Sequence, residues 1–269
     1  MKRLLLLALT AFAALPAIAQ NYDEYGILTY DPVYDFQTRS SVALDWKIAK
    51  GLHLEAEYEL RTEDLLSRLD RHQATLGLSY KIAPWLKAGV SYSYLYHHKT
   101  DSWTPRHRFN TDLTFSWKSG DWRFSVKEQL RLTHKTESVN PCQEVQNPLV
   151  LKSRAKVQYK GFEYIEPYAF VEVRNIFNDP SFSATWSSTS LNYADYVFTG
   201  YNSAYFNRYR GALGLEWNLS KHHSIDICTM LDYCYDKKID VDKTGTVLKL
   251  NSREQAINGI LSIGYKFSF

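Results

Sequence analysis

The fold is decided by the stretch Glu254 to Phe269, which reads EQAINGILSIGYKFSF. Every second residue from Gln255 onward gives a mostly apolar set that ends in Ile263, Tyr265, Phe267 and Phe269. The intervening residues are small or polar, apart from one isoleucine. Because successive side chains of a strand point to opposite faces, this stretch predicts a long strand with one apolar face.

The same alternation recurs throughout the chain and predicts about eleven strands. They are Thr38–Ile48, Leu52–Glu63, Arg71–Ile82, Leu86–Tyr96, Arg106–Lys118, Trp122–Thr133, Leu151–Tyr159, Ile165–Arg174, Arg208–Asn218, Ile225–Tyr235 and Glu254–Phe269. Short connections near Gly51, Pro84, Gly120, Gly161 and Lys221 alternate with longer ones near Leu66, Ser102, Pro141, Leu191 and Lys243. Alternating short turns and long loops are typical of outer-membrane barrels.

These observations predict an all-β fold, a transmembrane antiparallel up-and-down β-barrel. No segment after the N-terminal one approaches the 18 or so apolar residues of a spanning helix, and lipid admits only helices and closed sheets. The 20 Tyr, 13 Phe and 7 Trp supply aromatic girdles, while alternation keeps the mean hydropathy negative. An even strand number requires one more strand at Tyr25–Tyr30, for about twelve, with ten as the fallback.

The N-terminus has the pattern of a secretory signal peptide. Lys2 and Arg3 precede an apolar run and the small residues Ala17-Ile18-Ala19. We expect residues 1–19 to be removed and residues 20–269 to form one barrel domain. Without the two basic residues, 30 Lys and Arg face 29 Asp and Glu, and this near-zero net charge argues against a nucleic-acid partner.

Two segments carry a family resemblance. WKIAKGLHLEAEYELR (Trp46–Arg61) and NRYRGALGLEWNLSKHHSID (Asn207–Asp226) resemble an uncharacterised outer-membrane β-barrel family, domain of unknown function 2490, and the last strand resembles the closing strand of bacterial outer-membrane barrels. The resemblance implies a barrel in the outer membrane and no particular activity. It also implies outer-membrane lipid and lipopolysaccharide as surroundings, and the barrel-assembly machinery as a partner of the C-terminal strand.

The polar faces of the predicted strands are rich in charge of both signs. The candidate lumen-lining residues are Glu55, Glu57, Glu59, Arg61, Arg71, Arg106, Arg108, Asp112, Arg123, Arg131, Arg154, Glu166, Glu172, Arg174, Arg208, Arg210 and Glu216. They either cross-brace the wall as an ion-pair lattice or line a narrow pore. Twelve strands at a tilt near 40° enclose a backbone diameter of about 24 Å, so long side chains constrict the lumen.

Glu128 breaks the pattern, because it falls on the set predicted to face lipid. Pairing Trp117 with Trp122 across the turn places Thr111 opposite Glu128. One interpretation is structural: Glu128 lies at a bulge, or its carboxyl is protonated and hydrogen-bonded. The other interpretation is a catalytic carboxylate that faces the membrane.

The sequence predicts no catalytic, cofactor-binding or metal-ligating set. His72, His107 and His134 face outward without a serine at alternating spacing. The adjacent pairs at 97–98 and 222–223 point to opposite faces of a strand, so neither pair chelates a metal there.

The three cysteines form no framework of disulfides. Cys228 and Cys234 share a face but lie about 20 Å apart along a strand, too far for a disulfide. Either Cys142 pairs with Cys234, or all three cysteines stay free.

The stretch Phe177–Ser203 reads as a long irregular loop with seven aromatic residues, which either forms a binding surface or plugs the barrel mouth. We expect a non-enzymatic narrow channel or structural envelope protein with a charge-lined lumen, and a small solute or glycan as its ligand. The alternatives are a membrane-embedded lipid- or lipopolysaccharide-modifying enzyme and a surface barrel that binds glycan or protein.

Overall fold

The computed structural model describes residues 32–99, 102–189, 192–236, 239–250 and 254–269. The expected signal peptide and the candidate first strand at Tyr25–Tyr30 lie outside these residues. The strands are β1 (Val33–Ala49), β2 (Leu52–Glu63), β3 (Arg68–Ala83), β4 (Leu86–Lys99), β5 (Ser102–Ser119), β6 (Trp122–Lys135), β7 (Leu149–Tyr159), β8 (Ile165–Ser187), β9 (Asn192–Asn218), β10 (His223–Asp236), β11 (Ile239–Val241), β12 (Val247–Leu250) and β13 (Glu254–Ser268). None of the described residues forms a helix of the length and apolarity that crossing a membrane takes.

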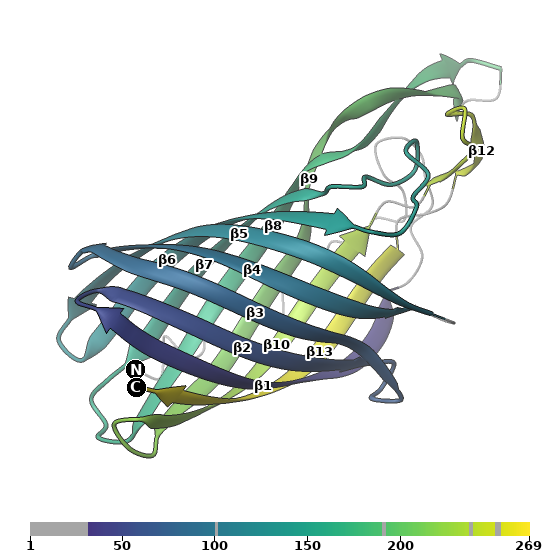
Figure 1. Ribbon diagram of the computed structural model, residues 1–269. Helices are drawn as coiled ribbons and strands as arrows, with labels where there is room; N and C mark the ends of the chain where they lie inside the picture. Colours follow the sequence, from purple (N-terminus) through teal and green to yellow (C-terminus); the bar gives the residue numbers. More distant parts are fainter. Residues whose placement is uncertain (1–31, 100–101, 190–191, 237–238, 251–253) are drawn as a thin grey trace.

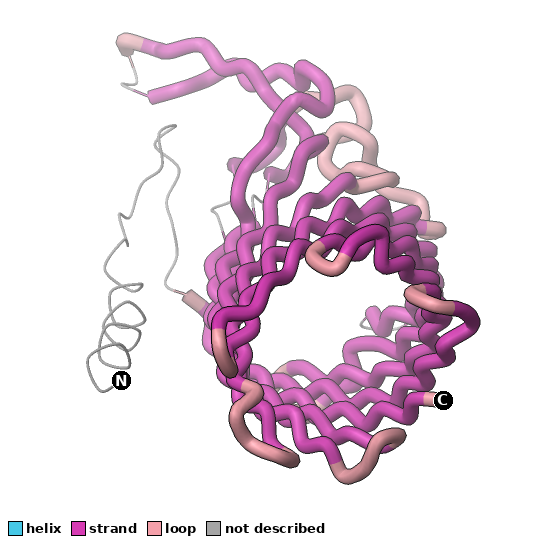
Figure 2. Tube along the Cα trace, turned by 90° about the vertical axis from the view of Figure 1, so that its left-hand side faces the viewer, coloured by secondary structure: helices cyan, strands magenta, loops and turns pink. Residues whose placement is uncertain are grey.

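Eleven of these strands close into a barrel, seen along its axis in Figure 2. Neighbouring strands are antiparallel throughout, except that β1 lies parallel to β13, from Val33 beside Ala256 to Asp45 beside Ser268. The predicted all-β barrel and its eleven alternating segments are confirmed. The parallel pair follows from the odd number of described strands, because β1 and β13 then run in the same direction.

The two ends of the barrel differ in their connections. The turns at Lys50–Gly51, Pro84–Trp85 and Gly120–Asp121 lie at one end, together with the connections 160–164 and 219–222 and the C-terminal Phe269. We call this the turn end and the opposite one the loop end. The longer connections expected near Ser102 and Leu66 are wrong. β4 and β5 extend to Lys99 and from Ser102, and the connection 64–67 between β2 and β3 is shorter than the connection 160–164 at the turn end.

Alternation separates an apolar outer wall from a polar inner one. On β5, Leu113 and Trp117 are 44% and 52% exposed on the outside, whereas Asn110 between the outward residues is only 6% exposed. Trp46, Trp85, Trp117, Trp122 and Trp217 all lie exposed at the turn end. The apolar set that a soluble protein would bury is therefore on the outside of this barrel.

The irregular loop expected over Phe177–Ser203 is wrong. β8 continues to Ser187 and β9 begins at Asn192, and the two strands pair beyond the barrel wall through several register shifts. Figure 1 shows this hairpin projecting away from the loop end rather than into the barrel mouth. The Tyr201 hydroxyl donates to the carbonyl oxygen of Pro141, which ties the hairpin to the β6–β7 connection.

Candidate functional site

The inner wall encloses two adjoining cavities. The first, of 230 Å³, is lined by β2 to β6, and we call it the β2–β6 cavity. The second, of 330 Å³, reaches from β1–β3 to β6–β10 and β13, and we call it the cross-lumen cavity. Glu57, Gln73 and Arg131 line both. The two cavities therefore meet inside the barrel and form one polar space.

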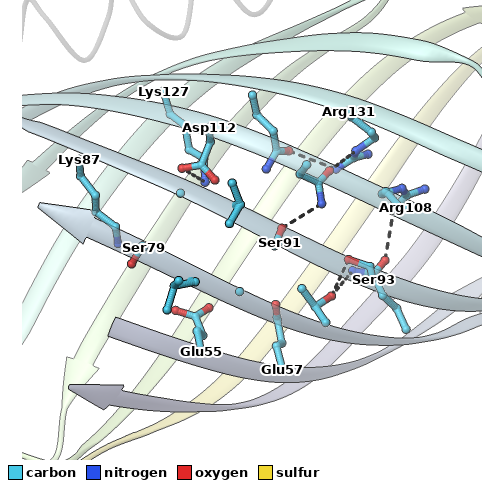
Figure 3. A pocket seen from close by; sticks show the side chains of 18 residues that line it. Glu55, Glu57, Ser79, Lys87, Ser91, Ser93, Arg108, Asp112, Lys127 and Arg131 are labelled. Carbon is cyan, nitrogen blue, oxygen red and sulfur yellow. Dashed lines mark hydrogen bonds and ion pairs between the residues drawn. The ribbon is translucent and has the colours of Figure 1, made fainter. Parts of the chain in front are cut away.

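The β2–β6 cavity is lined by a network of hydrogen bonds that joins arginines to neutral side chains, shown in Figure 3. Arg131 Nε donates to Asn110 Oδ1 at 3.1 Å, and Asn110 Nδ2 donates to Ser91 Oγ at 3.0 Å. Lys127 Nζ lies 3.4 Å from Asp112 Oδ2. Short side chains on β3 and β4 leave room for the long side chains that reach in from β5 and β6.

Glu172 is the most heavily shared carboxylate of the cross-lumen cavity. Arg154 donates to its Oε2 from Nε at 2.8 Å and from Nη2 at 2.5 Å. Lys152 Nζ and Arg210 Nη1 lie 3.2 and 3.6 Å from Oε1. The Glu172 side chain is 3% exposed, so its charge is removed from solvent and compensated by three cations.

Two further carboxylates beside this cavity hold arginines in the same way. Arg210 binds both oxygens of Asp232 through Nε and Nη2, and Arg208 Nη1 lies 3.5 Å from Oδ2. Arg61 binds Glu59 through Nε and Nη2, each at 2.6 Å. These forked contacts match the planar guanidinium to the carboxylate.

Four of the described arginines that line the cavities have no such partner. In the described part of the chain, no carboxylate oxygen lies within 4.0 Å of the guanidinium nitrogens of Arg39, Arg108, Arg131 or Arg174. Three of them donate only to neutral side chains, as Arg174 Nε does to Asn207 Oδ1 at 2.8 Å. Their positive charge is therefore left over after the ion pairs have formed.

Arg39 is the extreme case. Its side chain is buried, with 8% of the residue exposed, and among the described residues its Nε has no hydrogen-bond partner. Arg61 and Arg210 repel it, whereas Asp232 and Glu59 attract it, but both carboxylates already hold another arginine. The guanidinium therefore faces the cavity with unused donors.

Comparison with protein families now places the chain. The model of the family "Protein of unknown function (DUF2490)" matches residues 36–242. The chain belongs to this family. The resemblance inferred from the sequence is thus confirmed, and the activity of this DUF2490 protein has to be argued from its own residues.

No curated protein matches the chain. Among solved structures, an anion-selective porin from Comamonas acidovorans is similar at 11% sequence identity, with a TM-score of 0.33. The match covers 81% of the DUF2490 chain and 53% of the porin chain. The DUF2490 chain thus spans about half the length of that porin.

The structure brings most of the lumen residues expected from the sequence together. Those lining one or both cavities are Glu55, Glu57, Glu59, Arg61, Arg108, Asp112, Arg131, Arg154, Glu172, Arg174, Arg208 and Arg210. Arg71 and Arg106 lie toward the loop end, where each pairs with a carboxylate. Arg123, Glu166 and Glu216 lie toward the turn end, away from both cavities.

Several charged cavity residues were not among the sequence candidates, among them Arg39, Lys87, Lys127 and Lys152. All four stand on the polar face of predicted strands, so alternation alone would have found them. Which polar residues meet across the lumen is a different question, because it depends on how far each strand is staggered against the next.

The register of β5 and β6 corrects one expectation. Trp117 pairs with Phe124 and Trp122 with Ser119, so the expected pairing of the two tryptophans is wrong by two residues. The physical reason is the length of the turn, which consists of Gly120 and Asp121 alone. Gly120 adopts a positive φ of 58°, which a tight two-residue turn requires.

Glu128 consequently has another partner than the one expected. Leu113, not Thr111, lies opposite it on β5, and Ser153 lies opposite it on β7. Ser153 Oγ donates to Glu128 Oε2 at 2.5 Å, and the strand pairing shows no bulge at this position. The carboxyl is thus hydrogen-bonded to a hydroxyl on the outer wall.

The histidines and cysteines form no reactive cluster in the residues covered by the structure. His72, His107 and His134 each hydrogen-bond a tyrosine hydroxyl or an asparagine side chain, and no group of three potential ligands suits a metal there. All three cysteines are free. The pairing considered for Cys142 with Cys234 is wrong, because Cys142 Sγ points to the Lys243 carbonyl oxygen at 3.8 Å.

Proposed function

We propose that this DUF2490 protein is an outer-membrane barrel that forms a narrow channel for small polar solutes. The observation that carries the proposal is the combination of an exposed apolar outer wall with two polar cavities that meet inside the barrel. A membrane barrel shows this inside-out distribution, because lipid replaces water outside and water fills the inside.

The height of the outer wall supports a membrane location. On β5 the outward residues run from Trp117 near the turn end to His107 near the loop end. Ten residues at about 3.4 Å each and a tilt near 40° give about 26 Å, close to the band of about 25 Å in outer-membrane barrels. The exposed tryptophans at the turn end form one aromatic girdle, and Tyr92, Tyr94 and Tyr96 contribute to the other.

Orientation follows from the connections. Outer-membrane barrels keep short turns in the periplasm and long loops outside, so the turn end faces the periplasm and the projecting hairpin faces outward. The signal-peptide pattern of residues 1–19 supplies the export that this requires. The proposal also surrounds the wall with outer-membrane lipid and lipopolysaccharide, and makes the C-terminal strand the recognition element for the barrel-assembly machinery.

The lumen supports a narrow channel rather than a wide one. Eleven strands at a tilt near 40° enclose a backbone diameter of about 22 Å, and inward side chains take up most of it. What remains is 230 and 330 Å³ of polar space rather than a porin-like bore. Only small solutes fit this width.

Single-channel recording tests the proposal. The mature chain, refolded and inserted into planar bilayers, is expected to give small, steady, ohmic steps, and cell fractionation is expected to recover the protein with the outer membrane. A matched preparation heated to unfold the barrel is the control. Persistent silence of correctly folded protein in the bilayer would contradict the channel and leave a structural envelope protein.

A further inference from the structure

We infer that the cross-lumen cavity is a binding site for a small multivalent oxyanion of the phosphate or phosphomonoester class, held by Arg39, Arg131 and Arg174. These three arginines come from β1, β6 and β8, so they approach the cavity from opposite sides of the barrel. All three lack a carboxylate partner in the described residues. The site deepens the proposed channel and rests on the same lumen, but its binding is measurable without conduction.

The charge of the cavity favours an anion. Its lining includes eight cationic residues, seven Arg and one Lys, against the four acidic residues Glu57, Glu59, Glu172 and Asp226, an excess of +4. Asp232 behind the lining lowers the excess by one. Low-dielectric walls strengthen such a field. An anion of charge about −2, which a phosphomonoester carries at neutral pH, offsets the repulsion among the cationic residues that the protein's own carboxylates do not compensate.

The geometry of the spare donors favours an oxyanion over a halide. A guanidinium offers planar, forked N–H donors that match the oxygens of phosphate or carboxylate. Arg39 is buried with an unpartnered Nε, a state that is unfavourable unless an anion or water accepts the donors. A tetrahedral oxyanion can accept from several forks at once, whereas Glu59, Glu172 and Asp232 already hold other arginines.

The size of the cavity limits the ligand. A volume of 330 Å³ lies at the small end of the usual range for ligand sites, about 300–1,000 Å³. Inorganic phosphate or a short phosphomonoester fits, whereas a lipid or a polysaccharide does not. The ligand is therefore a solute rather than a component of the membrane.

Calorimetric titration of the folded, detergent-solubilised mature chain tests the site. Inorganic phosphate and glycerol 3-phosphate are the probes, and sodium chloride at equal ionic strength is the control, because screening alone weakens exposed charges. We expect saturable binding of at least one of the two probes and none of chloride. Tighter binding of glycerol 3-phosphate identifies the phosphomonoester as the preferred form, and absence of binding by both probes at millimolar concentration overturns the inference.

Substitutions assign the binding to the three arginines. Arg39→Gln, Arg131→Gln and Arg174→Gln are each expected to weaken the affinity about tenfold, as the loss of a charge-assisted contact does. Arg123→Gln is the matched control, because Arg123 lies at the turn end outside both cavities. Equal weakening by all four substitutions would show a general charge effect and overturn the site.

The conservative variant Arg39→Lys tests whether recognition depends on the forked donors. Lysine keeps the positive charge but loses the fork, so an affinity between those of wild type and Arg39→Gln supports forked recognition. Heat-dependent gel mobility checks that each variant is folded. Phosphate binding by a barrel that is silent in bilayers sustains the site and refutes the channel, whereas conduction without binding does the reverse.

Discussion

Two sets of arginines line the same lumen and differ in what they face. Arg154 and Arg210 are fixed by Glu172 and Asp232 in forked ion pairs. Arg39 and Arg131, on other strands of the same barrel, have no carboxylate oxygen within 4.0 Å among the residues described by the structure. One set is neutralised by the wall itself, and the other is not.

The difference separates structure from function within one polar surface. A buried ion pair that loses one partner leaves an uncompensated charge, so the paired set holds neighbouring strands in place. An unpaired cation adds repulsion that no carboxylate of the wall offsets, unless something outside the protein binds it. The sequence offered an ion-pair lattice and a pore lining as alternatives, and in the proposed channel the two roles fall to different residues.

The largest effect is expected where a shared carboxylate is neutralised. Glu172→Gln leaves Arg154, Lys152 and Arg210 without their common anion and is expected to destabilise the barrel by about 3–5 kcal/mol. Urea unfolding of the barrel refolded in lipid vesicles, followed by tryptophan fluorescence, measures the loss. Glu216→Gln is the control, because Glu216 accepts one hydrogen bond, from Gln158, and should cost less than about 1 kcal/mol. Equal losses of stability for the two variants would mean that a carboxylate shared by three cations contributes no more than Glu216 does.

The outer wall provides an intermediate case, a carboxyl whose partner is neutral. Among the residues that the structure describes, Glu128 is held only by the Ser153 hydroxyl, and it faces the lipid of the proposed membrane. Glu128→Leu is expected to stabilise the barrel by about 1–2 kcal/mol, since an acidic residue on the lipid face is unfavourable. The same unfolding assay measures the gain. Lost stability, or lost turnover of added phospholipid, would instead give this carboxyl a structural or catalytic role.

How much of the fold and of the candidate site the sequence predicts depends on how far apart in the chain the interacting residues lie. Alternation is local, and it predicted all eleven described barrel strands and the inward face of Glu172 or Arg131. It failed over residues 177–203, where Asn, Ser and Pro interrupt the apolar set although the backbone continues as a hairpin. The neighbour of Glu128 on β5 was misplaced because one turn length sets the register of a whole strand pair, and its partner Ser153 lies on β7, beyond the long connection 136–148.

The contrast between paired and spare arginines was beyond the sequence for a related reason. Arg39 and Arg210 are both arginines on polar strand faces and are indistinguishable by pattern. The register of the β9–β10 hairpin places Arg210 directly opposite Asp232, whereas the position of Arg39 depends on how β1 closes the barrel against β13. The number of charges was thus predictable, whereas their pairing was not.

A smaller effect of opposite sign is expected when a spare arginine is removed. Arg39→Gln relieves repulsion by Arg61 and Arg210 and should leave stability unchanged or raise it by about 1 kcal/mol in the absence of anions. The unfolding assay in phosphate-free buffer measures it. A loss as large as that of Glu172→Gln would mean that Arg39 is part of the lattice after all.

The smallest effect is expected for an ion pair outside the lumen. Arg68 lies 2.7 Å from Glu63 and 3.0 Å from Asp64 at the β2–β3 connection, where the Arg68 side chain is 37% exposed. By distance this cluster equals the pairs of Glu172, so a rule based on counting ion pairs predicts a similar loss for Arg68→Gln. Water already solvates these groups, and exposed pairs contribute about 0–1 kcal/mol, which salt screens further. We expect a loss below about 0.5 kcal/mol that vanishes at high salt. A larger, salt-insensitive loss in the unfolding assay would show that burial does not separate the two kinds of pair.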